Sequence, residues 1–248
     1  MHSKITDFLI TLSIVTLFTA QVRAQVDLDV ETGIVFSGYN DVRIPGNGGT
    51  LFSLSGELQA KPGFFYRFRV FYNFNDRHHL GALYAPLSIK STGQLERELI
   101  FEDETYPANT PLEAIYKFNS YRLIYRYDFL KKDKIELGVG FTAKIRDAKI
   151  AVKGNGIESE KTNVGFVPII HFRLFWKFSK SFAFLLDGDA LAAPQGRAED
   201  VIAALIFKAS DKIDIKAGYR ILEGGADNDE VYNFTLINYA SIGAIFYF

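Results

Sequence analysis

Two aspartates two positions apart, with a histidine in the segment before them, are the residues best suited to chemistry. Asp187 and Asp189 would share one face of an extended strand, because side chains alternate between the two faces. His171 lies in the preceding segment, where it can pair with an acid such as Asp187. A histidine beside carboxylates can act as a general base. The simpler interpretation, which we favour, is that these groups satisfy one another as ion pairs.

A hairpin rich in small residues follows these aspartates, over residues 187–200. Arg197 is close enough across the predicted hairpin to meet the two acids. One interpretation is a rim site for a cation or polar ligand, and the other, which we favour, is a hairpin with internally satisfied charges. Asp-x-Asp resembles a fragment of a calcium loop, but the other ligand positions of that pattern are absent. The stretch 224–230 is likewise interpreted as a solvated loop, so we expect no metal and no cofactor.

The remaining bases and nucleophiles form no recognisable catalytic group. His78 and His79 lie beside a predicted short turn, and His2 lies in the N-terminal segment. No Ser lies at an obvious partnering position for His171, and no nucleophile motif is present. The absence of Cys excludes disulfides and thiolate metal sites. We therefore assign no catalytic residue and favour a protein that is not an enzyme, with an enzyme as the alternative.

The composition suits a chain that must hide much apolar surface. The chain has 248 residues, of which 48% are hydrophobic and 15% aromatic, and its formal net charge is −1. A net charge near zero argues against nucleic acid as a partner. The aromatic content is high for a soluble domain, whereas it fits a membrane β-barrel with aromatic girdles at both interfaces.

The first 24 residues predict a secretory signal peptide. Lys4 gives a positive start, residues 8–20 are apolar apart from Thr and Ser, and cleavage is expected after Ala24. A transmembrane anchor is disfavoured because the run is short and is followed by acids, not by a positive cluster. No Cys follows the signal, so no lipoprotein anchor is expected. Residues 25–248 are predicted to form a single domain.

Most of this domain alternates between apolar and polar residues with the period of a β-strand. Pro86 interrupts the apolar segment 78–89 and predicts a bulge or a strand rim there. Short turns are expected near 76, 132, 180 and 211, and longer connections near 41–63, 90–112, 152–162, 194–199 and 225–231. Within these, 153–161 is predicted to be a polar loop, and 95–101 to pair with 112–118. About ten strands result.

The last segment, residues 232–248, closes this pattern. Phe248, Phe246 and Ile242 share its apolar face, and Phe248 is the final residue. A terminal aromatic on an amphipathic final strand resembles the closing strand of bacterial outer-membrane β-barrels, where it serves as the assembly signal. The resemblance implies an all-β, antiparallel, up-and-down transmembrane barrel in a Gram-negative outer membrane. It also implies outer-membrane lipid and the barrel-assembly machinery as partners, and leaves the oligomeric state open. The competing architecture is a soluble periplasmic sandwich or lipocalin-like barrel, with its apolar residues inside.

If the apolar face meets lipid, the charged residues point into the lumen. Acids on this face include Asp29 and Glu31, and bases include Arg67, Arg69 and Arg122. A lone buried charge is costly, so we expect a lattice of ion pairs that fills the narrow barrel, with a narrow pore as the alternative. The predicted lumen cluster consists of Lys144, Arg146, His171, Arg173, Asp187, Asp189, Arg197, Lys216 and Arg220.

We therefore expect a structural or narrow-channel, porin-like protein with a largely filled lumen and long extracellular loops. The alternative is an outer-membrane enzyme. Lipid A hydrolases and acyltransferases resemble the chain in size and use a His with a Ser and an acid. Omptin proteases have ten strands and use Asp pairs with a His at the outer rim. An enzyme predicts His171 or the paired acids near that rim, whereas a structural barrel predicts them saturated by Arg146, Arg173 or Arg220.

Overall fold

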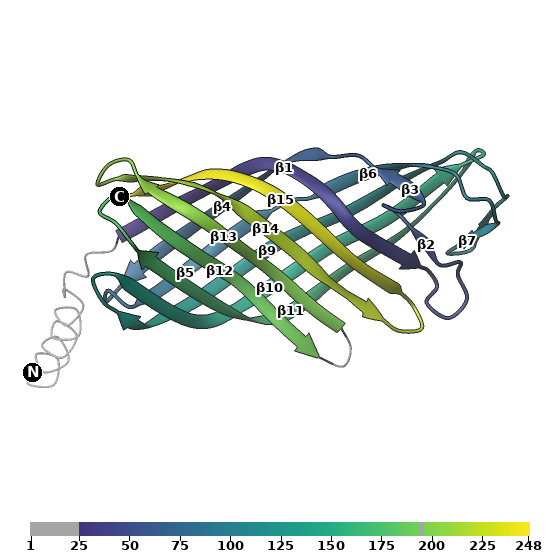
Figure 1. Cartoon of the computed structure of the whole chain (residues 1–248). Helices are drawn as coiled ribbons and strands as arrows, with labels where there is room; N and C mark the ends of the chain where they lie inside the picture. Colours follow the sequence, from purple (N-terminus) through teal and green to yellow (C-terminus); the bar gives the residue numbers. More distant parts are fainter. Residues whose placement is uncertain (1–24, 194–195) are drawn as a thin grey trace, which may run out of the picture.

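The computed structural model describes residues 25–193 and 196–248, which form a closed antiparallel barrel of ten strands (Figure 1). Each wall strand pairs with its neighbour in the sequence and the last pairs with the first, which confirms the predicted up-and-down barrel. The signal peptide and its cleavage after Ala24 lie outside the described residues. The described residues contain no helix long and apolar enough to cross a membrane. The wall strands are β1 (Gln25–Arg43), β4 (Gly63–Phe74), β5 (His78–Ala85), β9 (Leu112–Lys131), β10 (Ile135–Gly154), β11 (Ile157–Lys177), β12 (Phe182–Ala193), β13 (Gly196–Lys208), β14 (Ile213–Asp227) and β15 (Tyr232–Tyr247).

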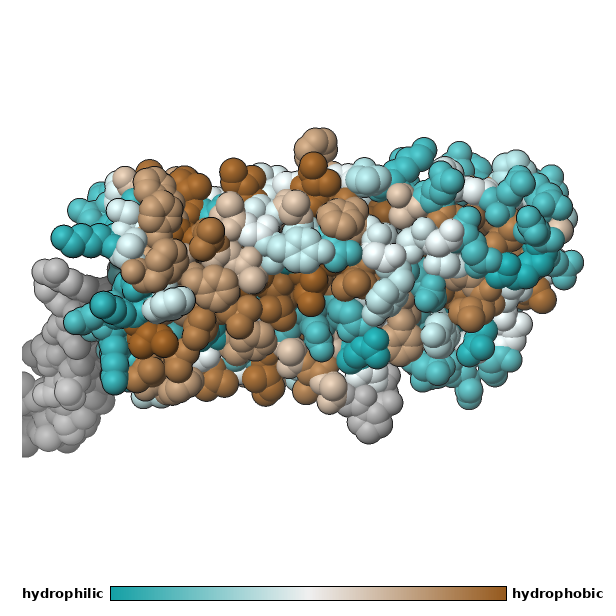
Figure 2. All heavy atoms as spheres, viewed as in Figure 1, coloured by the Kyte–Doolittle hydropathy of each residue, from teal (hydrophilic) through white to brown (hydrophobic). Residues whose placement is uncertain are grey.

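Alternation separates the side chains of the wall by polarity. On β4, Tyr66 and Phe68 point outward and are exposed, whereas Arg67 and Arg69 point inward and are buried. Figure 2 shows outward apolar residues over the part of the barrel nearest the C-terminus on the face in view, with hydrophilic residues over the opposite end. Exposed apolar side chains on the other wall strands continue this band, which we call the apolar belt. A soluble barrel would place its apolar residues inside, and this wall has the reverse arrangement.

Four tight turns gather at one end of the barrel, which we call the turn end (Figure 1). They occupy the positions predicted for short turns. In the first, a three-residue turn, Asn75 and Asp76 have positive φ angles of 53° and 57°, a backbone conformation in which Asn and Asp are enriched. The backbone N–H of Phe248 donates to the carbonyl oxygen of Val26 at 3.0 Å, so both ends of the described chain lie at this end.

The opposite end, which we call the loop end, differs from the sequence predictions. The predicted polar loop 153–161 is wrong, because β10 and β11 continue to a two-residue turn at Asn155 and Gly156. Both turn residues have positive φ, at 50° and 76°, as in the type I′ turns that Asn-Gly favours in two-residue hairpins. The polar residues that suggested a loop lie on a two-stranded ribbon beyond the apolar belt. The predicted last loop is also shorter, because β14 continues to Asp227.

The predicted pairing of 95–101 with 112–118 is also wrong. Residues 112–118 begin wall strand β9, which pairs there with β6 (Ser88–Gly93). Within the connection, β7 (Leu99–Phe101) pairs instead with β8 (Glu104–Tyr106). β6 continues the third wall strand after Pro86, because Ala85 and Ser88 both have partners on β9. Pro86 therefore interrupts this strand, as predicted.

The two longest connections fold into the lumen at the loop end and fill it with apolar side chains. The first carries β2 (Phe52–Ser53) and β3 (Leu58–Ala60), and the second carries β7 and β8. Phe52 and Phe101 meet edge to face with ring centroids 6.2 Å apart. The Tyr106 hydroxyl donates to the Val152 carbonyl at 3.0 Å. These side chains, which we call the apolar plug, are Ile44, Phe52, Leu54, Leu58, Leu95, Leu99, Phe101 and Tyr106, packed against inner-wall residues such as Val35, Tyr116, Val152 and Tyr239.

Candidate functional site

A layer of ion pairs crosses the middle of the lumen. Asp200 accepts from Arg67 at 2.9 Å and from Arg220 at 2.6 Å, and it also accepts a hydrogen bond from Arg122. Glu31 accepts two hydrogen bonds from Arg220, both at 2.8 Å. We call this set the charged layer, and none of its members is more than 6% exposed; they are Glu31, Arg67, Arg69, Arg122, Asp187, Asp189, Asp200, Lys216 and Arg220.

The layer is close to electrically balanced. Lys216 contacts Glu31 at 3.1 Å and also the less buried Asp29 at 2.6 Å. With Asp29 included, five carboxylates (residues 29, 31, 187, 189 and 200) face five cations (residues 67, 69, 122, 216 and 220). Pairing of this kind offsets the cost of removing each charge from water.

The paired aspartates belong to this layer, and the buried His171 contacts it. Asp189 lies opposite His171 in the register of β11 and β12, and it contacts the ring Nδ1 at 3.0 Å. Asp189 also accepts from Thr142 at 2.6 Å and from Arg122 at 2.5 Å. Asp187 accepts from Arg69 at 2.6 Å, while its contact with His171 Nε2 is 3.9 Å. His171 is therefore closer to Asp189 than to the partner predicted, Asp187.

These contacts bear on the two interpretations of the acids. An enzyme predicted them near the outer rim, whereas they lie in a buried mid-lumen layer. The structural interpretation expected Arg146, Arg173 or Arg220 to saturate them. Only Arg173 approaches, at 3.7 Å from Asp187, and Arg69 and Arg122 make the close contacts instead.

The predicted lumen cluster is divided among four places in the structure. His171, Asp187, Asp189, Lys216 and Arg220 meet in the charged layer. Arg173 lies on the turn-end side of the layer, and Lys144 and Arg146 lie on its loop-end side. The prediction that Arg197 meets the paired acids is wrong. Its side chain alternates to the outer surface of β13, where its Nη2 pairs with Glu223 at 2.7 Å.

The predicted cluster lacked several central members. Arg67, Arg69 and Arg122 were expected to face the lumen but were not included in the cluster. Asp200 was missed as a lumen residue because it appeared to belong to a hairpin tip. Asp200 lies two positions before Ile202 on the same strand, so the two side chains share a face. Because Ile202 faces inward, this spacing is the signal that places Asp200 in the lumen.

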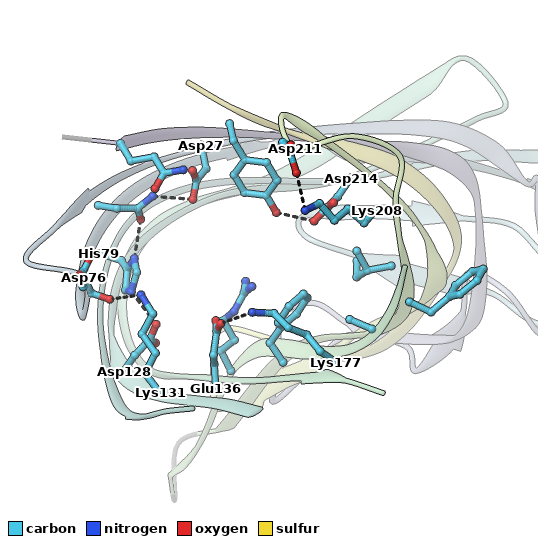
Figure 3. Close-up of a pocket in the computed structure, with 18 of the residues that line it drawn as sticks. Asp27, Asp76, His79, Asp128, Lys131, Glu136, Lys177, Lys208, Asp211 and Asp214 are labelled. Atoms are coloured by element: carbon cyan, nitrogen blue, oxygen red, sulfur yellow. Dashed lines mark hydrogen bonds and ion pairs between the residues drawn. The ribbon is translucent and has the colours of Figure 1, made fainter. Parts of the chain in front are cut away.

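A polar cavity of about 810 Å³ separates the charged layer from the tight turns. In this turn-end vestibule, His79 contacts Asn73 through Nδ1 at 2.6 Å and Asp128 through Nε2 at 2.7 Å. On the opposite wall, the Tyr247 hydroxyl donates to Asp214 at 2.8 Å. Figure 3 shows His79, Asp128 and Asp214 around a hollow centre, together with the Lys177–Glu136 and Lys208–Asp211 pairs.

A second cavity, of about 380 Å³, lies on the other side of the charged layer beside the apolar plug. We call it the loop-end pocket. The order along β9 shows the separation: Tyr116 and Phe118 line this pocket, Arg122 lies in the layer, and Asp128 lines the vestibule. The two cavities share no lining residue. The apolar side chains of the pocket include Ile44, Tyr116, Phe118, Ile150, Val167, Leu191, Leu222 and Val231.

Two cations on β10 point into the loop-end pocket. Lys144 is 2% exposed, and its Nζ lies 4.7 Å from the centre of the Phe118 ring. Arg146, two residues further on the same face, donates to Asn163 on β11. Within residues 25–193 and 196–248, no carboxylate pairs with Lys144, and no group of three or more His, Asp or Glu is arranged to hold a metal ion.

Comparisons with known proteins identify the fold. No protein-family model matches the sequence, and no curated protein sequence matches it. The outer-membrane protease OmpT of Escherichia coli superimposes with a TM-score of 0.54 at 9% identity, over 90% of this chain and 97% of that one. The translocator domain of the autotransporter NalP from Neisseria meningitidis gives 0.44 at 10% identity, over 99% of this chain and 95% of that one. The attachment invasion locus protein Ail of Yersinia pestis gives 0.37 at 13%, over 90% and 99%. With its ten closed strands, this chain has the fold of the bacterial outer-membrane β-barrel proteins.

Proposed function

We propose that this protein is an integral protein of the bacterial outer membrane whose barrel is closed to solute flow. In this arrangement the turn end faces the periplasm, and the loop end carries the external contacts. The observation that carries the proposal is the charged layer, which fills the lumen with paired side chains that are at most 6% exposed.

The outer belt supports membrane insertion. Exposed apolar side chains follow one another along neighbouring strands, for example Tyr125 on β9, Phe141 on β10 and Ile170 on β11. In water such a continuous surface would cause aggregation, whereas a bilayer solvates it. Over most of the wall the backbone groups also pair between strands, which the hydrocarbon core requires of a spanning structure.

The pairing within the layer supports a closed lumen. A continuous file of water would have to separate charges such as Asp200 from the three arginines that hold it. Removing one partner from a buried ion pair costs about 3–5 kcal/mol, and the lumen would have to open several such pairs together. The apolar plug closes the same lumen a second time toward the loop end.

Planar bilayer recordings test this proposal. Refolded protein is first identified by a band that migrates faster unless it is boiled, and is then added to bilayers in which a known porin serves as positive control. We expect no discrete conductance steps across the applied voltages. Reproducible steps from the wild-type barrel would overturn the closed-lumen proposal.

Localisation has its own test. In detergent-extracted outer membranes, the protein is expected to give a compact band that shifts on boiling. A protein found soluble in the periplasm, with no shift, would overturn membrane integration.

We further propose that the barrel-assembly machinery inserts the protein and reads Phe248, which is 74% exposed at the end of β15. Deleting Phe248 is then expected to lower the amount of folded barrel in cells severalfold while leaving refolding into detergent unchanged. The matched control is Phe248→Tyr, which keeps a terminal aromatic. Equal losses in cells and in detergent would indicate a structural role for Phe248 and contradict the assembly role.

A further inference from the structure

The barrel wall is incomplete between β11 and β12. β12 pairs with β11 only over Ile170–Lys177, whereas β10 pairs with β11 along its whole length. In the part of the chain that the structure describes, no strand pairs with the β12 side of β11 beyond Ile170. Figure 1 shows the reason, because the β12–β13 hairpin ends well short of β10 and β11. We call this break the side opening.

Pro168 lies at the start of the unpaired edge. Proline has no N–H to donate, so within sheets it is confined to edges, first residues and bulges. Continuing the register beyond Ile170 and Ala190 would place Ile169 opposite Leu191 and then Pro168 opposite Ala192, and neither pair forms. A proline in the middle of a 21-residue strand thus marks the point at which the wall opens.

The side opening lies at the level of the apolar belt. Along the unpaired edge, Val164 is 71% exposed and Phe166 is 65% exposed, and both point outward. Outward polar residues begin only beyond them, at Thr162 and Glu160. The opening therefore faces the outer leaflet of the membrane, where free backbone groups are tolerated if they line a cavity.

Behind the opening lies the loop-end pocket. Its lining includes Val167 on β11, Leu191 on β12 and Ala198 on β13, which flank the opening on both sides. The remaining lining is apolar over most of its area, and its two carboxylates are Glu230 and Glu223, the latter paired with Arg197. At about 380 Å³ the pocket lies in the size range of small-molecule sites, which suits one acyl chain better than a lipid with several chains and a sugar headgroup.

The floor of the pocket is positively charged. Lys144 lies beside Arg122 of the charged layer in the register of β9 and β10. The carboxylates of the layer nearest Lys144, Asp189 and Asp200, are held by Arg122. The Nε atom of Arg146 is buried and has no hydrogen-bond partner among the described residues. A buried cation without an anion is unfavourable, so this floor suits a ligand that brings one.

We propose that the loop-end pocket binds a single-chain amphiphilic anion of the fatty-acid class, which enters from the outer leaflet through the side opening. Its carboxylate contacts Lys144 and Arg146, and its chain lies against Phe118, Val167 and Leu222. The inference rests on the proposed membrane integration for its entry route. The pocket itself can be tested in detergent, where the band shift on boiling reports the barrel separately from binding.

The test is a titration of folded, detergent-solubilised protein with 11-(dansylamino)undecanoic acid, followed by displacement with dodecanoate or with dodecanol. Saturable binding is expected, with dodecanoate displacing the fluorophore at lower concentration than dodecanol. Lys144→Met is expected to weaken dodecanoate about tenfold or more, as for loss of a charge-assisted hydrogen bond, and to leave dodecanol unchanged. Lys144→Arg should retain dodecanoate, and Lys153→Met on the exposed ribbon is the matched control.

Each other outcome overturns the proposal. No saturable binding to a barrel that shows the band shift removes the site. Equal displacement by dodecanoate and dodecanol would show that the site does not prefer an anion. Unchanged dodecanoate affinity in Lys144→Met would show that Lys144 does not bind the carboxylate. Val167→Trp should block both ligands at the mouth, whereas Phe141→Trp on the outer belt should block neither. Binding that survives Val167→Trp would place the ligand elsewhere.

Discussion

The charged layer and the apolar plug occupy neighbouring parts of one lumen, but they fill it by different means. The layer is built from wall residues alone, because Arg and Lys side chains are long enough to meet across the barrel. The plug needs two inserted connections, because Leu and Phe on the wall are too short to close the same space. Where neither the long side chains nor the inserted connections reach, the loop-end pocket remains. The loop-end pocket is therefore the space that remains between the charged layer and the apolar plug.

The largest expected effect is on the layer. Arg122→Ala leaves Asp189 and Asp200 each without one of its cations, and should lower the free energy of unfolding by about 3–5 kcal/mol. Urea unfolding in lipid vesicles, followed by the band shift, measures this loss. Replacing Arg122 and Asp189 together by Leu should recover part of it. A single variant as stable as wild type would show that the layer does not hold the barrel together.

The next effect should separate the plug from the barrel. Phe101→Ala removes a fully buried ring from the plug and should cost about 3 kcal/mol locally. Limited proteolysis is expected to cut the connection 94–111 faster, while the urea midpoint of the barrel changes little. If the midpoint falls as far as in Arg122→Ala, the plug and the layer form one cooperative unit and the comparison fails.

A smaller effect is expected from the polar anchor of the plug. Tyr106→Phe removes the hydrogen bond from the hydroxyl to the Val152 carbonyl and leaves the ring in place. The expected cost is about 1 kcal/mol, with a proteolysis rate between those of wild type and Phe101→Ala. A rate equal to that of Phe101→Ala would mean that the plug depends on this hydrogen bond more than on packing.

The smallest effect belongs to the surface of the plug. Arg97 pairs with Glu57 at 2.5 Å, both half-exposed, and their hydrogen bond lowers the pKa of Glu57 below its ordinary value of 4.5. The stabilisation is present above pH 4.5 and is lost as the pH falls through the lowered pKa. Arg97→Ala should therefore cost under about 1 kcal/mol at neutral pH and nothing at low pH, since exposed pairs are screened. A larger loss that persists in acid would contradict this assignment.

The wall strands could be predicted from the sequence because their residues alternate between apolar and polar with a period of two. The segment 135–146 has the clearest alternation, and the structure has β10 there with Lys144 and Arg146 inward. The four short turns were equally visible, since each carries an Asp, Asn or Ser that favours turns, for example Asn75, Asp133 and Ser179. Periodicity gives the face of a residue but not its height in the barrel, so it could not separate Lys144 from the charged layer.

The interior of the loop end could not be predicted in this way. Phe52, Leu58 and Phe101 lie in connections without a regular period, so their inward packing depends on contacts distant in sequence. Two local signals were nevertheless present. Asn155-Gly156 is a strong hairpin signal within the predicted loop, and Pro168 marks a strand edge.

The Asn155–Gly156 turn has a practical consequence. Beyond the belt, β10 and β11 form a ribbon that reaches the loop end beside the connection that carries β7 (Figure 1). Its two-residue tip makes no pairing contact with the rest of the wall, so an epitope peptide inserted there should be carried without disturbing the barrel. Antibody staining of intact cells would then report which way the protein is inserted.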